Sequence, residues 1–200
     1  MSHRARRPRK LRAIEAVLDL GHRAVLDAAC GPGTYLAHFG PGSFGLDRDA
    51  AVLSAARTRG CEVLQRDLSA AGWSAGLPAF EAVWLCDALV HLPDPGAFLA
   101  ELRAITPAGT PVAVAEWVLP QRGRLRRALA LATPGARAFW AHPEHLHRFT
   151  EPDLIGLLDR AGFEPQGRIL HSLPAPLRRQ PVVSLLAPWL PPRTLLARAR

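Results

Sequence analysis

Apolar residues follow two spacings along this chain, one typical of buried strands and one typical of amphipathic helices. Short apolar runs predict strands at residues 25–28, 43–46, 62–65, 80–86, 110–117, 163–171 and 193–199. The helical rhythm predicts helices at residues 10–20, 34–39, 50–59, 95–105 and 151–161. Because strands and helices alternate over most of the chain, we expect an α/β fold with a doubly wound, mostly parallel sheet and helices on both faces.

Capping residues mark several of the predicted helix boundaries. Asp49 can accept hydrogen bonds from the first turn of one helix, and Thr150 stands in the same position before another. Asp153 follows Thr150 by the spacing of a capping box. Gly21 and Gly162 follow the last apolar positions of two helices, where glycine commonly ends a helix.

The length and composition of the chain predict one globular domain. Its 200 residues are 48% hydrophobic and 21% charged, and no apolar run approaches the roughly 20 residues that span a bilayer. No apolar signal segment follows the basic N-terminus, so we expect a cytoplasmic protein. The cysteines are interpreted as reduced core residues. Within the domain we expect residues 1–10 to form a basic, flexible tail and residues 118–149 to form a substrate-side insertion or lid.

The net charge of +8 is concentrated at the two ends of the chain. Residues 4–10 and 165–200 carry basic groups and no acid, whereas the remainder is slightly acidic. A dedicated nucleic-acid-binding domain usually has a basic face on its body, which this distribution does not indicate. The basic ends could still contact RNA or an anionic lipid, and the apolar segment Pro181–Pro191 could contact a membrane surface or cover a pocket.

The stretch Val25–Gly33 reads as a buried strand that opens into a glycine turn. Asp27, Asp47 and Asp67 follow at intervals of 20 residues, each at or near the end of a predicted strand. Parallel strands end at one edge of the sheet, so these acids should gather there. An acid after the second strand can accept hydrogen bonds from both hydroxyls of a ribose. Together these features predict an adenosine-containing ligand.

The spacing after the glycine turn disfavours a dinucleotide. A dinucleotide fingerprint needs a third glycine three residues after the second, and Leu36 stands there. A cofactor with an amino-acid tail fits better, because it needs no phosphate cradle and its ammonium can meet Asp27 or nearby carbonyls.

These motifs resemble those of the class I S-adenosylmethionine-dependent methyltransferases. The similarity is greatest to the type 11 group, which includes the ubiquinone and menaquinone C-methyltransferases. The segments that carry it are residues 25–33, 44–57, 65–68, 80–95, 102–109 and 147–163. Glu81 and Ala108 depart from the family pattern, which usually has Asp and Gly at these positions. The resemblance implies a Rossmann-like, seven-stranded sheet, S-adenosyl-L-methionine as cofactor, and methyl transfer as the activity.

The predicted site residues fall at the ends of successive strands. The predicted cofactor-binding residues are Asp27, Ala29, Cys30, Gly31, Gly33, Asp47, Arg48, Asp67, Leu68, Cys86 and Asp87. A base is needed only where the acceptor atom holds a proton at neutral pH, and the catalytic candidates are His91 and His147, with His142 and His145 nearby. The histidines at 142, 145 and 147 have a spacing that could hold zinc, but no cysteine lies nearby, and no metal is predicted.

Three functions remain open at this stage. The first is methyl transfer to a small-molecule acceptor, since the aromatic and apolar segment at 117–149 suits a pocket lining. The second is methylation of an RNA such as tRNA, suggested by the basic ends and by four arginines, Arg122, Arg124, Arg126 and Arg127. The third is a noncatalytic protein that binds S-adenosylmethionine through the same fold. The oligomeric state is not predicted.

Overall fold

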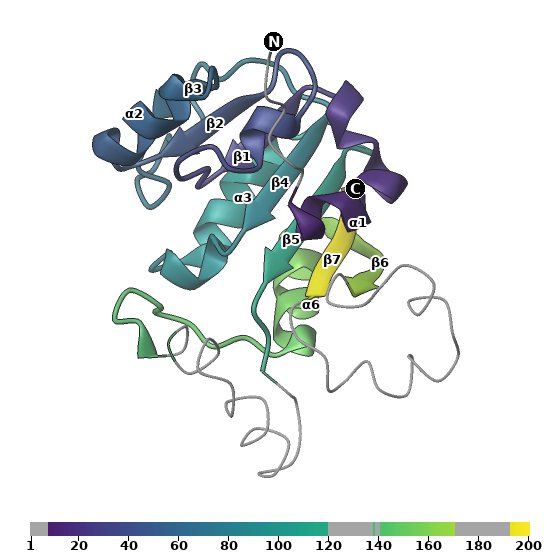
Figure 1. The fold of residues 1–200 in the computed structure, drawn as a ribbon. Helices are drawn as coiled ribbons and strands as arrows, with labels where there is room; N and C mark the ends of the chain where they lie inside the picture. The colour runs from purple at the N-terminus through teal and green to yellow at the C-terminus, as the bar shows by residue number, and fades with distance from the viewer. Residues whose placement is uncertain (1–7, 120–137, 139–140, 171–192) are drawn as a thin grey trace.

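A computed structural model describes residues 8–119, 138, 141–170 and 193–200 (Figure 1). The strands are β1 (Val25–Ala28), β2 (Phe44–Asp47), β3 (Glu62–Gln65), β4 (Ala82–Cys86), β5 (Pro111–Glu116), β6 (Phe163–Leu170) and β7 (Arg193–Ala199). The α-helices are α1 (Arg9–Leu18), α2 (Ala50–Thr58), α3 (Pro95–Ile105) and α6 (Glu151–Arg160). Three short 3-10 helices join them, η1 (Leu20–His22), η2 (Leu36–His38) and η3 (Leu89–His91).

The described strands form one seven-stranded sheet in the order β3-β2-β1-β4-β5-β7-β6. The first five strands pair in parallel, and β7 lies antiparallel between β5 and β6. Strand order reverses between β1 and β4, which is where ligands bind in sheets of this kind. This arrangement confirms the predicted α/β fold with a mostly parallel sheet.

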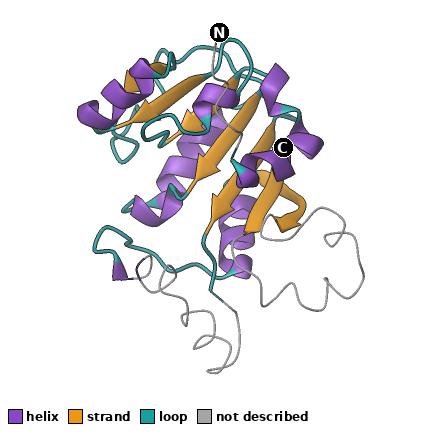
Figure 2. Cartoon of the chain, in the orientation of Figure 1, coloured by secondary structure: helices purple, strands orange, loops and turns teal. Residues whose placement is uncertain are grey.

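The central strands are buried on both faces, which explains why their sequences are continuous apolar runs. In β4, Val83 and Leu85 pack into a core shared with α3 and α6, whereas Ala82 and Trp84 pack into a second core beneath α1. Helices therefore cover both faces of the sheet, as predicted (Figure 2). None of the helices in the described ranges is long and apolar enough to cross a membrane.

Several helix boundaries differ from the sequence-based expectation. The first helix ends at Leu18 because Asp19 adopts a left-handed conformation with φ +50°, two residues before Gly21. Residues 34–39 contain only the single turn η2, since the chain is already extended at Phe39. The helix after Thr150 begins as predicted, and the carboxylate of Asp153 accepts the Thr150 N–H at 2.8 Å.

Lys10 lies in α1, as the helix predicted for residues 10–20 implies, and not in a flexible tail, which was also predicted to reach residue 10. Its side chain is only 14% exposed. Other predicted features lie outside the described residues: the four arginines at 122–127, most of the 118–149 insertion, and Pro181–Pro191.

Gly45 is required for the close packing of the glycine turn against β2. A Cβ at this position would lie 2.5 Å from Sγ of Cys30 and 2.7 Å from a methyl carbon of Leu36. Cys30 is buried beneath the turn, together with Leu36 and Leu53. The missing side chain therefore lets the turn lie directly on the neighbouring strand.

We expect Gly45→Ala to lower the free energy of unfolding by about 1–3 kcal/mol, because the surrounding core must shift to admit a methyl group. Urea unfolding measures this change. Gly167→Ala is the matched control in β6, where nothing lies within 4 Å of the added carbon, and it should stay within about 0.5 kcal/mol of the wild type. Equal effects in the two variants would contradict this packing argument.

Glu116 at the end of β5 fixes the turn between β4 and η3. It is 1% exposed, and its Oε1 accepts the N–H groups of Ala88 at 2.8 Å and Leu89 at 2.7 Å. Burial, with the charge of Asp87 as the next cause, raises the pKa of Glu116 from 4.5 to about 8. The native state therefore holds this proton more tightly than the unfolded chain does.

The upward pKa shift of Glu116 makes its contribution to stability full at low pH and progressively lost between pH 4.5 and about 8. Glu116→Gln keeps an oxygen for the two amides but cannot ionise. We expect the free energy of unfolding of the variant, relative to the wild type, to rise across this window by on the order of 3–5 kcal/mol. Urea unfolding from about pH 5 to about pH 9 tests it, and a constant difference would show that Glu116 does not titrate as a buried acid.

Candidate functional site

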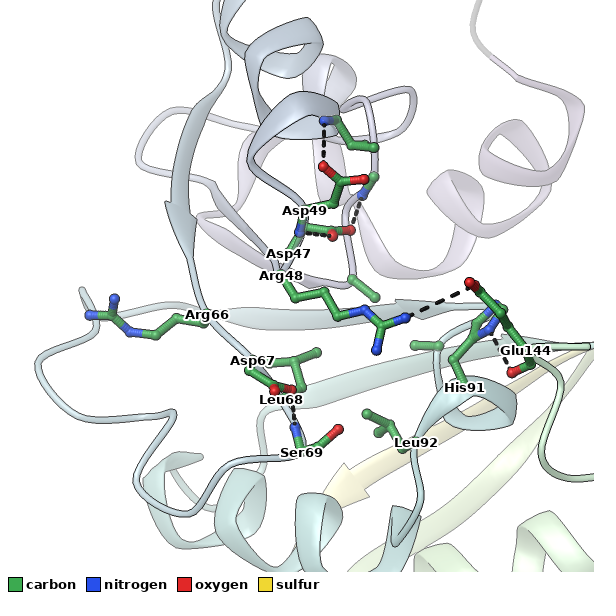
Figure 3. Close-up of a pocket in the computed structure, with 14 residues that line it drawn as sticks. Asp47, Arg48, Asp49, Arg66, Asp67, Leu68, Ser69, His91, Leu92 and Glu144 are labelled. Carbon is green, nitrogen blue, oxygen red and sulfur yellow. Dashed lines mark hydrogen bonds and ion pairs between the residues drawn. The ribbon is translucent and has the colours of Figure 1, made fainter.

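A pocket of about 340 Å³ opens beyond the carboxyl ends of β1, β2, β3 and β4 (Figure 3). This is the edge at which the sequence placed the acids and the glycine turn. The lining side chains come from the loops after these strands, from the first turn of α2, and from the segment 141–150.

The glycine turn after β1 forms one wall of the pocket. Ala29 and Gly31 line it, and both have positive φ angles, +61° and +53°. This conformation is costly for Ala29, which has a Cβ, and such strain is concentrated at functional sites. Gly33 also has a positive φ, but it packs against Ala56 of α2 and Cys61 and does not line the pocket.

The carboxylate of Asp47 joins this turn to the loop after β2. Its Oδ2 accepts the Gly31 N–H at 3.0 Å, and its Oδ1 accepts the Asp49 N–H at 3.0 Å. Asp49 in turn caps α2 by accepting the N–H of Ala51 at 2.8 Å. Two main-chain donors thus fix the orientation of Asp47 at the pocket wall, and Figure 3 shows Asp47 and Asp49 together there.

The loop after β3 forms the next part of the wall. Asp67 accepts the Ser69 N–H at 2.9 Å, and the Arg66 N–H donates to the Asp47 carbonyl at 2.9 Å. Leu68 is 7% exposed and lines the pocket between these polar residues. The loop therefore offers one acid and one apolar side chain to the pocket.

The opposite wall consists of η3 and the segment 141–150. His91 and Leu92 line it, and Nδ1 of His91 lies 3.1 Å from the Glu144 carbonyl. The Leu146 N–H also donates to the Val90 carbonyl at 2.7 Å. The segment 141–150 is therefore held on η3 by main-chain groups.

Arg48 reaches across the pocket toward this segment, as Figure 3 shows. Its guanidinium lies 4.0 Å from the carboxylate of Glu144, and both side chains are more than half exposed. An exposed ion pair of this kind contributes little to stability. Its position matters more, because both side chains line the pocket and come from opposite walls.

The remaining histidines lie around this wall. His147 does not line the pocket: its Nε2 is bonded to the Leu92 carbonyl at 2.8 Å, and its ring stacks on Phe149. The rings of His142 and His145 lie beside His91, at centroid distances of 6.5 and 4.7 Å. Among the described residues, the cluster whose ligand atoms could meet at one metal ion is a different one, formed by Glu15, Asp19 and His22 at the surface.

Asp27 lies behind the glycine turn and is 2% exposed. Burial, with the nearby charge of Asp47 as a second cause, raises the pKa of Asp27 well above its ordinary value. Its Oδ2 has no hydrogen-bond partner among the described residues. Asp27 is therefore a buried acid with a raised pKa, and one of its oxygens has no partner in the described part of the chain.

Cys86 and Asp87, at the end of β4, contact Lys10 rather than the pocket. The Lys10 ammonium lies 3.1 Å from Sγ of Cys86 and 3.4 Å from Oδ2 of Asp87. Asp87 has φ +53°, a second strained position at the end of a central strand. The following residue, Ala88, does line the pocket, so this group lies directly beside it.

The structure thus brings together part of the predicted set. The predicted cofactor-binding residues that line the pocket are Ala29, Gly31, Asp47, Arg48, Asp67 and Leu68. Those that lie beside or behind it are Asp27, Cys30, Gly33, Cys86 and Asp87. The lining residues that the sequence did not single out for the site are Asp49, Val52, Arg66, Ser69, Ala88, Leu92 and Glu144. All but Val52 lie within three residues of a predicted site residue, so proximity in sequence was an available signal for them.

Comparisons with known proteins agree with this geometry. A family model described as a methyltransferase domain matches residues 2–167. An uncharacterized methyltransferase of Mycobacterium tuberculosis (strain ATCC 25618 / H37Rv) is 37% identical over 113 residues, covering 54% of this chain and 57% of that protein. The chain therefore spans little more than half the length of this relative.

Two solved structures share the fold. An S-adenosylmethionine-dependent methyltransferase from Mesorhizobium loti gives a TM-score of 0.64 at 18% identity, covering 96% of this chain and 98% of that one. The magnesium protoporphyrin IX methyltransferase of Synechocystis PCC 6803, solved with bound SAH, gives 0.62 at 16% identity, covering 96% and 80%. The chain belongs to the methyltransferase domain family, and its fold is that of the class I S-adenosylmethionine-dependent methyltransferases.

Proposed function

We propose that this protein is a methyltransferase that uses S-adenosyl-L-methionine and acts on a small-molecule acceptor. The observation that carries the proposal is the fixed carboxylate of Asp47, which faces a pocket shared with Asp67 and the glycine turn. Membership in the family supports the reaction type. The choice of a small acceptor rests on a pocket of molecular size at this edge of the sheet.

The residues around the pocket fit the adenosine part of this cofactor. A carboxylate has about four acceptor positions, and main-chain amides occupy two of those on Asp47. The others remain for the hydroxyls of a ribose. Val52, Leu68 and Leu92 supply apolar surface for a purine ring, and Asp67 supplies an acceptor at its edge.

The polar atoms beside the pocket fit a cofactor that carries an amino-acid tail. Oδ2 of Asp27 is buried without a partner in the described part of the chain, at the end of the strand that leads into the glycine turn. A buried acceptor of this kind is costly unless a ligand or water satisfies it. An ammonium group near Asp27 would favour ionisation of its carboxyl.

The cofactor supplies an activated methyl group when it is bound, so the chain must mainly orient the two partners and exclude water. The segment 141–150 and the side chains of Arg48 and Glu144 stand where they would limit access of solvent to the pocket. Because Nε2 of His147 is engaged by the Leu92 carbonyl, we assign His147 a positioning role in this wall. His91 lines the pocket, and its role as a base stays a prediction.

Asp47→Asn should weaken the binding of S-adenosylhomocysteine about tenfold or more, since hydrogen bonds to a charged acceptor contribute about 1.5–3 kcal/mol. Isothermal titration calorimetry measures the affinity, and circular dichroism verifies the fold. Asp94→Asn is the control, because Asp94 caps α3 by accepting the Ala97 N–H and does not line the pocket. A folded wild-type protein that does not bind, or equal affinities for the two variants, would contradict the proposal.

The acceptor class is tested with methyl-labelled cofactor. The protein is incubated with a small-molecule extract and, separately, with total RNA, and mass spectrometry locates the label. We expect label in the small-molecule fraction. Label confined to RNA would establish the alternative substrate, and cofactor binding without any labelled product would favour a noncatalytic protein.

A further inference from the structure

Lys10 is the only lysine in a chain that contains 25 lysines and arginines. It lies near the start of α1 with a side chain that is 14% exposed, and its Nζ donates to Sγ of Cys86 and to Oδ2 of Asp87. Nζ also lies 5.9 Å from the centre of the Tyr35 ring. A buried ammonium is costly to desolvate, and these contacts offset part of that cost.

Asp87 carries two further signs of a binding position. Its backbone has φ +53°, a strained value for a residue with a side chain, and the conformation is held by the hydrogen bond from its N–H to the Ala115 carbonyl at 3.0 Å. Its Oδ1 is buried and has no partner among the described residues. The side chain as a whole is 32% exposed, and the next residue, Ala88, lines the pocket.

We propose that Lys10 and Asp87 form the subsite for the methyl acceptor and that this subsite takes a hydroxyl group of the phenol class. The inference rests on the proposed methyltransferase function. A hydroxyl can donate to the unpartnered Oδ1 of Asp87 and can accept from Lys10. An ammonium has three N–H donors, and Cys86 and Asp87 use two of those on Lys10.

Methyl transfer to a phenol oxygen needs Asp87, Lys10 and the bound cofactor, and no further reactant. The acceptor O–H bond breaks and its proton passes to Oδ1 of Asp87, while the acceptor oxygen forms a bond to the methyl carbon. The bond between that carbon and sulfur breaks, and its electron pair returns to sulfur, so the sulfonium becomes a neutral thioether. Lys10 stabilises the negative charge that develops on the oxygen, and Asp87 then releases the proton to solvent.

The charge of Lys10 favours an oxygen acceptor over an amine. Burial alone lowers the pKa of Lys10, but the charge of Asp87 and the hydrogen bond to Cys86 outweigh it, so the pKa is raised and the ammonium stays charged. An amine acceptor would become a cation beside this ammonium, whereas a phenol gives a neutral ether. Burial raises the pKa of Cys86, so its thiol remains protonated and is not a nucleophile.

The test measures the binding of 4-methylphenol by calorimetry in the presence of saturating S-adenosylhomocysteine. We expect Lys10→Met to lower the affinity for 4-methylphenol by about tenfold or more, with the affinity for S-adenosylhomocysteine nearly unchanged. Asp87→Asn, which preserves side-chain size, should lower phenol affinity likewise. Arg12→Met removes an exposed cation from the same helix and should change neither affinity. Lysine labelled with carbon-13 gives one resonance, which should shift with 4-methylphenol and not with toluene.

Each other outcome overturns the assignment. Loss of S-adenosylhomocysteine binding in a folded Lys10→Met variant would show that Lys10 holds the cofactor instead of the acceptor. Absence of phenol binding by the wild type, or equal phenol affinity in Lys10→Met, would exclude a hydroxyl subsite here. Failure of the wild type to bind S-adenosylhomocysteine would instead refute the proposed function itself, so the two failures are distinguishable.

Discussion

The site depends on the two hydrogen bonds that the Asp47 carboxylate accepts from main-chain N–H groups. The carboxylate accepts one N–H from the glycine turn after β1 and another from the residue that caps α2, so one side chain fixes two loops and a helix. Central parallel strands are buried on both faces and can carry polar groups only where they end. Acids and strained turns therefore gather at one edge of the sheet, and Asp47 gives this edge a defined shape.

This concentration of polar groups costs stability through backbone strain and the burial of acids, and both are found at the ends of neighbouring strands. Ala29 and Asp87 are strained residues at the ends of adjacent strands, and Asp27 and Glu116 are buried acids with raised pKa values. Perturbed acids and strained backbone cluster at functional sites because ligands can satisfy them. The second core, beneath α1, consists of apolar side chains. It positions Lys10 beside Asp87 and takes no part in the chemistry.

Local signals explain which parts were predictable from the sequence. The bounds of β3 and α3 match the prediction, since apolar periodicity and caps act over a few residues. Asp47 and Asp67 could be predicted because they follow Asp27 at intervals of 20 residues, which is the length of one strand and its connection to the next. Lys10 was predicted both to begin a helix and to end a basic tail, and only its packing against the end of β4 shows that its side chain is largely buried. Glu144 stands three residues before the candidate His147, but its approach to Arg48 across 96 residues of chain depends on tertiary structure alone.

The central claim is that Asp47 and its neighbours form a site for the adenosine part of the cofactor, and a crystal structure with S-adenosylhomocysteine tests it most directly. The account predicts that the ribose hydroxyls donate to the Asp47 carboxylate and that the purine lies between Leu68 and Leu92. A ligand bound elsewhere, or bound in this pocket without contact to Asp47, would contradict it.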